Sequence, residues 1–190
     1  MVQSDFLDKE SLFIYTKSVI KVVYILRGAV RMAERELQFP KTMAQLNQLI
    51  ADISQLETNI QQIHWYMRGS EFFRLHPQMD SYNEDLDEQL DEIAERLIAL
   101  GGTPYATTHE FIEHTGLPDD KIAWNQYSLP ELMQRLDDQF GYLGKQYRIG
   151  MEVSDEEKDF STQDMLNGFK ADVDKWIWMI SAYLGKGPLD

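Results

Sequence analysis

The residues of this chain that could hold a metal ion are few, and most of them lie on two adjacent stretches. The sequence has no cysteine and only four histidines, so a metal site must use His, Asp and Glu. His64 and His76 flank a predicted tight turn, which would place them side by side on an antiparallel helix pair. The pairs His76/Asp80 and Asp91/Glu95 are each four residues apart, a spacing that places both members on one helix face.

The two pairs are too far apart to bind one ion within a single chain. Asp80 and Asp91 are separated by 11 residues, which is roughly 16 Å along a helix. They could be two unrelated half-sites, or two copies of the helix could pack antiparallel across a two-fold axis near residue 85 or 86. We favour the second arrangement, in which His64, His76 and Asp80 of one chain face Asp91 and Glu95 of the other, forming two identical sites.

This set of nitrogen and oxygen ligands suits Fe(II), Mn(II) or Zn(II), and carboxylates accommodate both Fe(II) and Fe(III). An ordinary solvent-exposed helix face also carries Asp and Glu at every third or fourth residue, so the carboxylates alone do not establish a site. A di-iron oxygenase bundle would carry paired Glu-x-x-His motifs, and the sequence contains none.

The elements that must position these residues are helices, because apolar residues recur every three or four positions. The spacing predicts helices over residues 42–67 and 72–97, followed by an irregular stretch over 103–127 with one short helical turn near Glu110. Thr42 is the predicted N-cap of the first helix. Two further helices are expected to begin with the capping sequences at Ser128 and Ser161.

Four such helices, with a connection of about 25 residues between the two pairs, predict an all-α fold, a four-helix bundle with a long crossover connection. Residues 42–190 are assigned to this bundle. Residues 1–41 are expected to form a separate N-terminal amphipathic helix and linker. The basic arc of this predicted helix consists of Lys17, Lys21, Arg27, Arg31 and Arg35.

The charge of the chain is distributed unevenly. The net charge is −14, yet residues 11–33 contain four basic and no acidic residues. The overall acidity excludes a protein that coats nucleic acid with its whole surface. The acidic N-terminus does not resemble a signal peptide, and no apolar run is long enough for a membrane helix. We therefore expect a cytoplasmic protein, associated with the nucleoid if it binds DNA.

Several segments together resemble the Dps family, the DNA-binding proteins from starved cells, within the ferritin-like superfamily. The intervals of 12, 4, 11 and 4 residues between the five ligands match the family's inter-subunit ferroxidase site without gaps. The resemblance covers roughly residues 42–186. It is carried by His64-Trp65-Tyr66-Met67-Arg68-Gly69, Phe72-Phe73-Arg74-Leu75-His76, Asp80, Asp91-Glu92-Ile93-Ala94-Glu95-Arg96, Gly101-Gly102-Thr103-Pro104 and Trp178-Met-Ile-Ser-Ala-Tyr-Leu-Gly185.

The resemblance implies a ferritin-like hollow dodecamer that binds Fe(II) at two-fold interfaces, oxidises it with hydrogen peroxide and stores the ferric mineral. His64, His76 and Asp80 would come from one subunit, and Asp91 and Glu95 from its neighbour. Trp65 resembles the family's tryptophan near the iron, which donates electrons to radical by-products; a core aromatic is the alternative. Asp159 and Asp164 lie about where the family's acidic iron-entry pores are found, although an N-terminal helix charge also explains Asp164.

The N-terminal segment departs from the family core in length and pattern. Its basic residues could contact DNA phosphates, and many copies in one shell would multiply the effect. The same amphipathic pattern would also serve a membrane surface or a partner, or would pack on the shell itself. The leading functional hypothesis is a peroxide-using ferroxidase and iron store that protects DNA. The alternative is a nucleoid-compacting scaffold in which metal binding is secondary.

Overall fold

The computed structural model describes residues 10–16, 19–26, 29–36 and 38–187, the first three stretches by their backbone path. Two compact units, Met1–Pro40 and Lys41–Asp190, are considered separately. Among the residues described, no helix combines the length and apolarity needed to cross a membrane.

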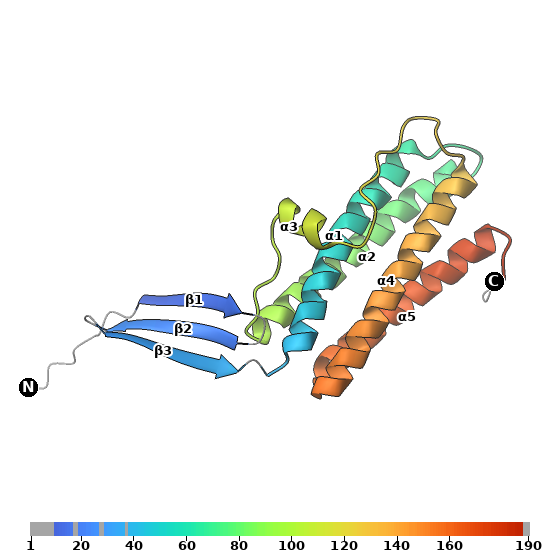
Figure 1. Cartoon of the computed structure of the whole chain (residues 1–190). Helices are drawn as coiled ribbons and strands as arrows, with labels where there is room; N and C mark the ends of the chain where they lie inside the picture. The colour runs from blue at the N-terminus through green and yellow to red at the C-terminus, as the bar shows by residue number, and fades with distance from the viewer. Residues whose placement is uncertain (1–9, 17–18, 27–28, 37, 188–190) are drawn as a thin grey trace, which may run out of the picture. The chain divides into compact units, whose positions relative to one another are not determined.

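The second unit is an all-helical bundle (Figure 1). Its helices are α1 (Pro40–Tyr66), α2 (Phe72–Ala99), the short α3 (Thr108–His114), α4 (Leu129–Glu157) and α5 (Phe160–Tyr183). The predicted helices are thus confirmed, and so is the short turn near Glu110. The predicted capping sequence at Ser161 is wrong, because α5 begins at Phe160 and its N-cap is Asp159. Apolar side chains from all four long helices form the core, in which Tyr82, Phe140 and Trp176 contact one another edge to face or at a tilt.

The start of α4 confirms the predicted capping box. The Glu131 carboxylate accepts hydrogen bonds from both the backbone N–H and the hydroxyl of Ser128, at 2.7 and 2.6 Å. The end of α2 confirms the glycine stop signal, because Gly101 adopts a left-handed φ of 88°.

The predicted N-cap at Thr42 is wrong, because the first helix begins at Pro40. The carboxylate of Glu157, at the end of α4, instead accepts the backbone N–H groups of Lys41 and Thr42, at 3.0 and 2.9 Å. A carboxylate at a helix N-terminus satisfies free N–H groups and complements the helix dipole. Here the residue that does so comes from 115 positions further along the chain.

The connection between α2 and α4 runs along α1 for the length of the bundle, as predicted for a crossover (Figure 1). Polar side chains at successive positions on α1 hydrogen-bond to successive parts of it. The pairs are Asn47 with Thr103 and Tyr105, Gln48 with His114, Asp52 with Thr115 and Gly116, Asn59 with Pro118, and Gln62 with Ile122. These bonds satisfy backbone groups of an otherwise irregular segment.

The predicted N-terminal helix is wrong. The backbone forms three antiparallel strands, β1 (Glu10–Thr16), β2 (Val19–Leu26) and β3 (Ala29–Glu36), in the order β1-β2-β3. Thr16 pairs with Val19 and Leu26 with Ala29, so each hairpin closes across two residues. The segment is rich in Val, Ile, Tyr and Phe, which favour strands, and so dense an apolar run fits period 2 as well as period 3.6.

Candidate metal centre

The two predicted histidine ligands lie side by side in the structure. His64 is in the last turn of α1 and His76 in the first turns of α2, and the short link between the helices brings the rings to a centroid distance of 3.7 Å. His76 Nδ1 lies 3.2 Å from the carbonyl oxygen of His64, and the His76 ring stacks on Phe72 at 4.7 Å. Packing therefore holds both rings in place before any ion binds.

Asp80, the third residue predicted for this half-site, lies beside His64. Its Oδ1 lies 3.3 Å from His64 Nδ1, while 58% of the Asp80 side chain and only 12% of the His64 side chain are exposed. The His64 Nδ1 atom is buried and has no partner in hydrogen-bond geometry within the part of the chain that the structure describes. A buried imidazole nitrogen with no hydrogen bond is suited to binding a metal ion, with the exposed carboxylate beside it.

The structure does not bring Asp91 and Glu95 to this half-site. Both are exposed and lie on α2 with Asp80, and α2 is one continuous helix over Phe72–Ala99. The roughly 16 Å between Asp80 and Asp91 therefore persists. Within the described part of a single chain, no group of three or more His, Asp or Glu residues is arranged to hold a metal ion.

Trp65 is not a core aromatic of the single chain, because 62% of its surface is exposed. The alternative that it packs in the core is therefore wrong. Trp178, at 52% exposed, is also outside the core. Trp176, with 7% exposed, is the core tryptophan of α5.

Asp159 and Asp164, the residues predicted to line an iron-entry pore, differ in their surroundings. Asp159 is the N-cap of α5 and only 4% exposed, and its carboxylate is engaged by Arg96 and Thr162. Asp164 is exposed on the first turns of α5. The N-cap of α5 is therefore Asp159, whose oxygens are already occupied within the chain.

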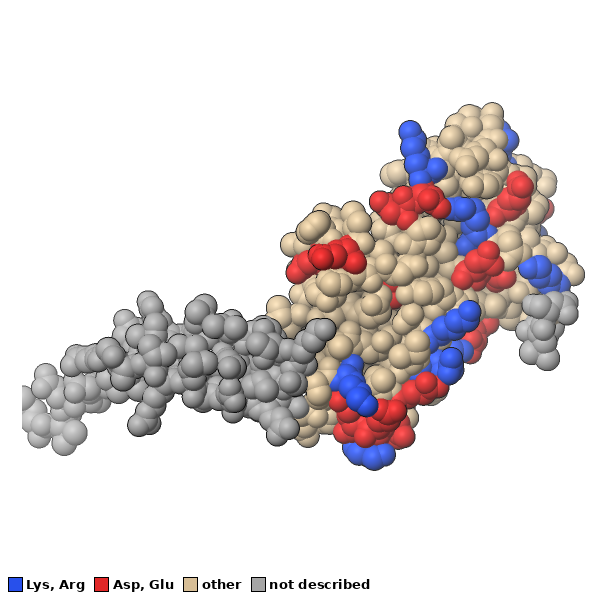
Figure 2. All heavy atoms as spheres, viewed as in Figure 1, with Lys and Arg blue, Asp and Glu red and all other residues tan. Residues whose placement is uncertain are grey.

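The residues predicted to contact DNA do not form one face of a helix. Lys21 lies on β2, Arg31 and Arg35 lie on β3, and Lys17 and Arg27 fall outside the described residues. In the strand register, Lys21 pairs with both Ile14 and Glu34. On the bundle face drawn in Figure 2, Lys and Arg side chains are interspersed with acidic ones.

Sequence reasoning missed Glu57, a partly buried carboxyl on α1. Burial, and secondarily the negative charge of Asp87 on α2, raises the pKa of Glu57 to about 7. Glu57 lies seven residues after the buried Ile50 and seven before His64, so all three share one side of α1. That position on the inward side of the helix is the signal that could have identified it.

This raised pKa predicts a pH-dependent stability. The folded chain keeps the Glu57 proton up to pH 7, whereas the unfolded chain releases it near pH 4.5. The free energy of unfolding should therefore fall by about 1–2 kcal/mol as the pH rises through this window, and stay level above it. The E57Q variant should lose that slope and D87N only part of it, when thermal unfolding is followed between pH 5 and 8. An unchanged slope in E57Q contradicts the assignment.

A bundle with this crossover, and histidines and carboxylates on its first two long helices, defines a class of protein. The sequence profile of the Ferritin-like domain matches residues 43–189 of the chain, so the class is that of the ferritin-like proteins.

Relatives identify the family within that class. The chain is 43% identical to the "DNA protection during starvation protein" of Listeria innocua, over 76% of this chain and 92% of that protein. It is 44% identical to the protein of that name from Streptococcus suis, over 76% and 84%. The crystal structure of Dps from Listeria monocytogenes superposes with a TM-score of 0.77 at 42% identity, covering 78% of this chain and 96% of that one. The Staphylococcus aureus Dps structure gives 0.70 at 31% identity, over 75% and 94%. The chain belongs to the Dps family.

Proposed function

We propose that copies of this chain assemble into a hollow dodecamer that oxidises Fe(II) with hydrogen peroxide and stores the ferric product. The observation that carries the proposal is the division of five suitable ligands between two ends of one helix pair. His64, His76 and Asp80 lie at one end, and Asp91 and Glu95 lie at the other. A two-fold axis between two such chains makes each incomplete half complete, and does so twice.

The similarity to known proteins supports the same proposal. A solved structure of Listeria innocua Dps, soaked with cobalt, superposes on the bundle with a TM-score of 0.77 at 42% identity. That protein was therefore exposed to a divalent metal of the kind that His and carboxylate ligands bind.

The chemistry follows from the ligand types. Fe(II) is the substrate, and the acidity of the chain favours its approach. Two Fe(II) ions give up one electron each, the O–O bond of one peroxide breaks, and two protons complete two water molecules. Because both electrons are transferred to one peroxide, no hydroxyl radical leaves the site. The carboxylates of Asp80, Asp91 and Glu95 offset the added charge on iron.

An anaerobic Fe(II) titration followed by stoichiometric peroxide tests this function. We expect all of the Fe(II) to be oxidised in a single phase once one peroxide has been added for every two Fe(II). A spin trap should report little hydroxyl radical. Free Fe(II) in the same buffer is the control, and it should give abundant radical adduct. Oxidation that stalls in the presence of the protein would overturn the ferroxidase assignment.

DNA binding is a second candidate function, in which the shell acts as a nucleoid scaffold. Relatives carry the name "DNA protection during starvation protein", while the alignment to them spans 145 residues and this chain has 190. The N-terminal strands carry Lys21, Arg31 and Arg35, and a dodecameric shell would present twelve copies of these strands to DNA. Such a shell would act in the cytoplasm, at the nucleoid.

Replacing Lys21, Arg31 and Arg35 by Gln together should therefore reduce gel retardation of plasmid DNA. The wild-type retardation should weaken steeply as salt rises, because phosphate contacts release counterions. K121Q in the crossover is a matched control and should leave retardation unchanged. Equal retardation by wild type and the triple variant would refute a role for the strands.

A further inference from the structure

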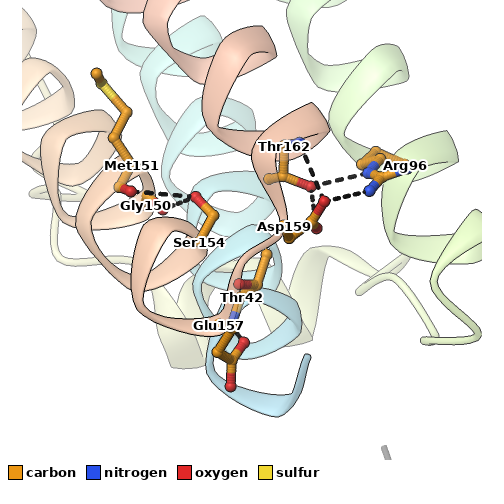
Figure 3. Close-up of polar contacts among 8 residues, drawn as sticks. All are labelled: Thr42, Arg96, Gly150, Met151, Ser154, Glu157, Asp159 and Thr162. Atoms are coloured by element: carbon orange, nitrogen blue, oxygen red, sulfur yellow. Dashed lines mark hydrogen bonds and ion pairs between the residues drawn. The ribbon is translucent and has the colours of Figure 1, made fainter. Parts of the chain in front are cut away.

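A buried polar cluster joins the last turn of α2 to the first turn of α5 (Figure 3). Arg96 Nη2 lies 2.5 Å from Asp159 Oδ1, and Arg96 Nε donates a hydrogen bond to Thr162 Oγ1 at 2.8 Å. The Thr162 hydroxyl in turn donates to Asp159 Oδ2 at 2.5 Å. Every member thus contacts the other two. We call Arg96, Asp159 and Thr162 the α2–α5 clamp.

The clamp is largely shielded from water, so its three side chains are held in place mainly by their contacts with one another. Thr162 is fully buried, 3% of the Asp159 side chain is exposed, and Arg96 retains 26%. Asp159 also caps α5, where its carboxylate accepts the Thr162 backbone N–H at 3.3 Å. A guanidinium that donates through two separate nitrogens fixes both the position and the rotation of its own side chain.

Arg96 directly follows Glu95, one of the carboxylates that the proposed site takes from the neighbouring subunit. α2 ends at Ala99, so Glu95 lies within its last two turns, where a helix is most prone to fray. The apolar contacts of Ile93 and Leu97 anchor the inner side of this segment. The clamp anchors it to α5 on the adjacent side.

We propose that Arg96 is a positioning residue that acts through Glu95. The clamp holds the last turns of α2 against α5. It thereby fixes the position of the Glu95 carboxylate relative to the His64 half-site of the partner chain. The inference rests on the proposed function, since it requires the inter-chain site to exist. It also assigns Asp159 a role in place of iron entry, because both of its oxygens are used by the clamp.

Anaerobic Co(II) titration of the assembled protein tests the clamp without turnover. The R96M variant keeps the aliphatic stem, and T162V keeps the shape of the threonine. Loss of a group that orients a metal ligand typically costs 10- to 100-fold in affinity. We therefore expect Co(II) to bind about tenfold more weakly to R96M, less so to T162V, with altered visible absorption. The control R148M removes an exposed ion pair with Glu152 within α4, and should bind Co(II) like wild type.

A double-mutant cycle with E95Q separates positioning from general destabilisation. If Arg96 acts through Glu95, R96M should add nothing to the loss of Co(II) affinity already caused by E95Q. Additive losses, or unchanged Co(II) binding by both R96M and T162V, would overturn the inference while leaving the site intact. Failure of the wild-type protein to bind Co(II) would overturn the proposed site and the role of the clamp together.

Discussion

The D91N/E95Q double variant is expected to lose Fe(II) oxidation by peroxide by at least about 100-fold, because it removes the negative ligands that one chain lends to its neighbour. Both substitutions keep the size of the side chain. Both side chains are exposed on α2, so the fold of the single chain should not depend on them.

Stopped-flow absorbance of ferric product gives the rate, and light scattering of the same sample checks that the shell still assembles. D119N/D120N removes the same charge from exposed positions in the crossover and should oxidise iron at the wild-type rate. Wild-type oxidation by D91N/E95Q would show that these carboxylates are an ordinary solvent-exposed face.

Replacing Asp52 by Ala is expected to lower the free energy of unfolding by about 3 kcal/mol, because it removes a buried acceptor and leaves several partly buried donors unpaired. Asp52 has no exposed surface. Its two oxygens accept hydrogen bonds from Gln48 at 3.1 Å, Thr115 Oγ1 at 3.0 Å, the Gly116 N–H at 2.9 Å and Tyr142 at 3.2 Å. One carboxylate thus joins α1, the crossover and α4.

Loss of the Asp52 carboxylate should also loosen one particular part of the chain, the crossover. Amide hydrogen exchange should speed up most in the crossover near residues 115–118, and thermal unfolding should begin earlier. Y142F, which removes one of the donors, should cost only about 1 kcal/mol. Because burial and the Asp52 charge raise the pKa of Tyr142 to about 12, D52A should also lower the pKa of that phenol in a spectroscopic titration. Unchanged exchange in the crossover would contradict this role for Asp52.

The helices of the bundle could be predicted from sequence because their signals are local. The three-and-four spacing of apolar residues marks each long helix, and Ser128 with Glu131 marks the start of α4. The half-site was predictable for the same reason: His64 and His76 are only 12 residues apart, so a tight turn is enough to bring them together.

The features that escaped prediction depend on residues distant in the chain. Thr42 has the residue type of an N-cap, but Glu157 from the end of α4 satisfies the start of α1. Asp159 has the residue type of a pore carboxylate, but Arg96 lies against it across the bundle. Trp178 is two positions after the buried Trp176, so it lies on another side of α5 and is half exposed within the described part of the chain.

The N-terminal strands show a different limitation. The apolar residues between Tyr15 and Ala33 fit one arc of a helix, and the charges fit the opposite arc. The choice between helix and strand there depends on the preference of β-branched and aromatic residues for strands, and on pairing across two-residue connections. A single helical period fits the whole segment only if it runs through both two-residue connections, so the helical pattern gives no sign of them.

Subunit complementation is the most direct test of a metal centre divided between chains. H64A/H76A and D91N/E95Q should each fail to oxidise Fe(II) when assembled alone. When the two variants are co-assembled at random, half of the dimers contain one of each. In such a dimer one pocket receives both defects and the other receives none, so about one quarter of the wild-type number of sites should be active. Recovery of this size is the predicted result; mixed shells as inactive as either parent would contradict it.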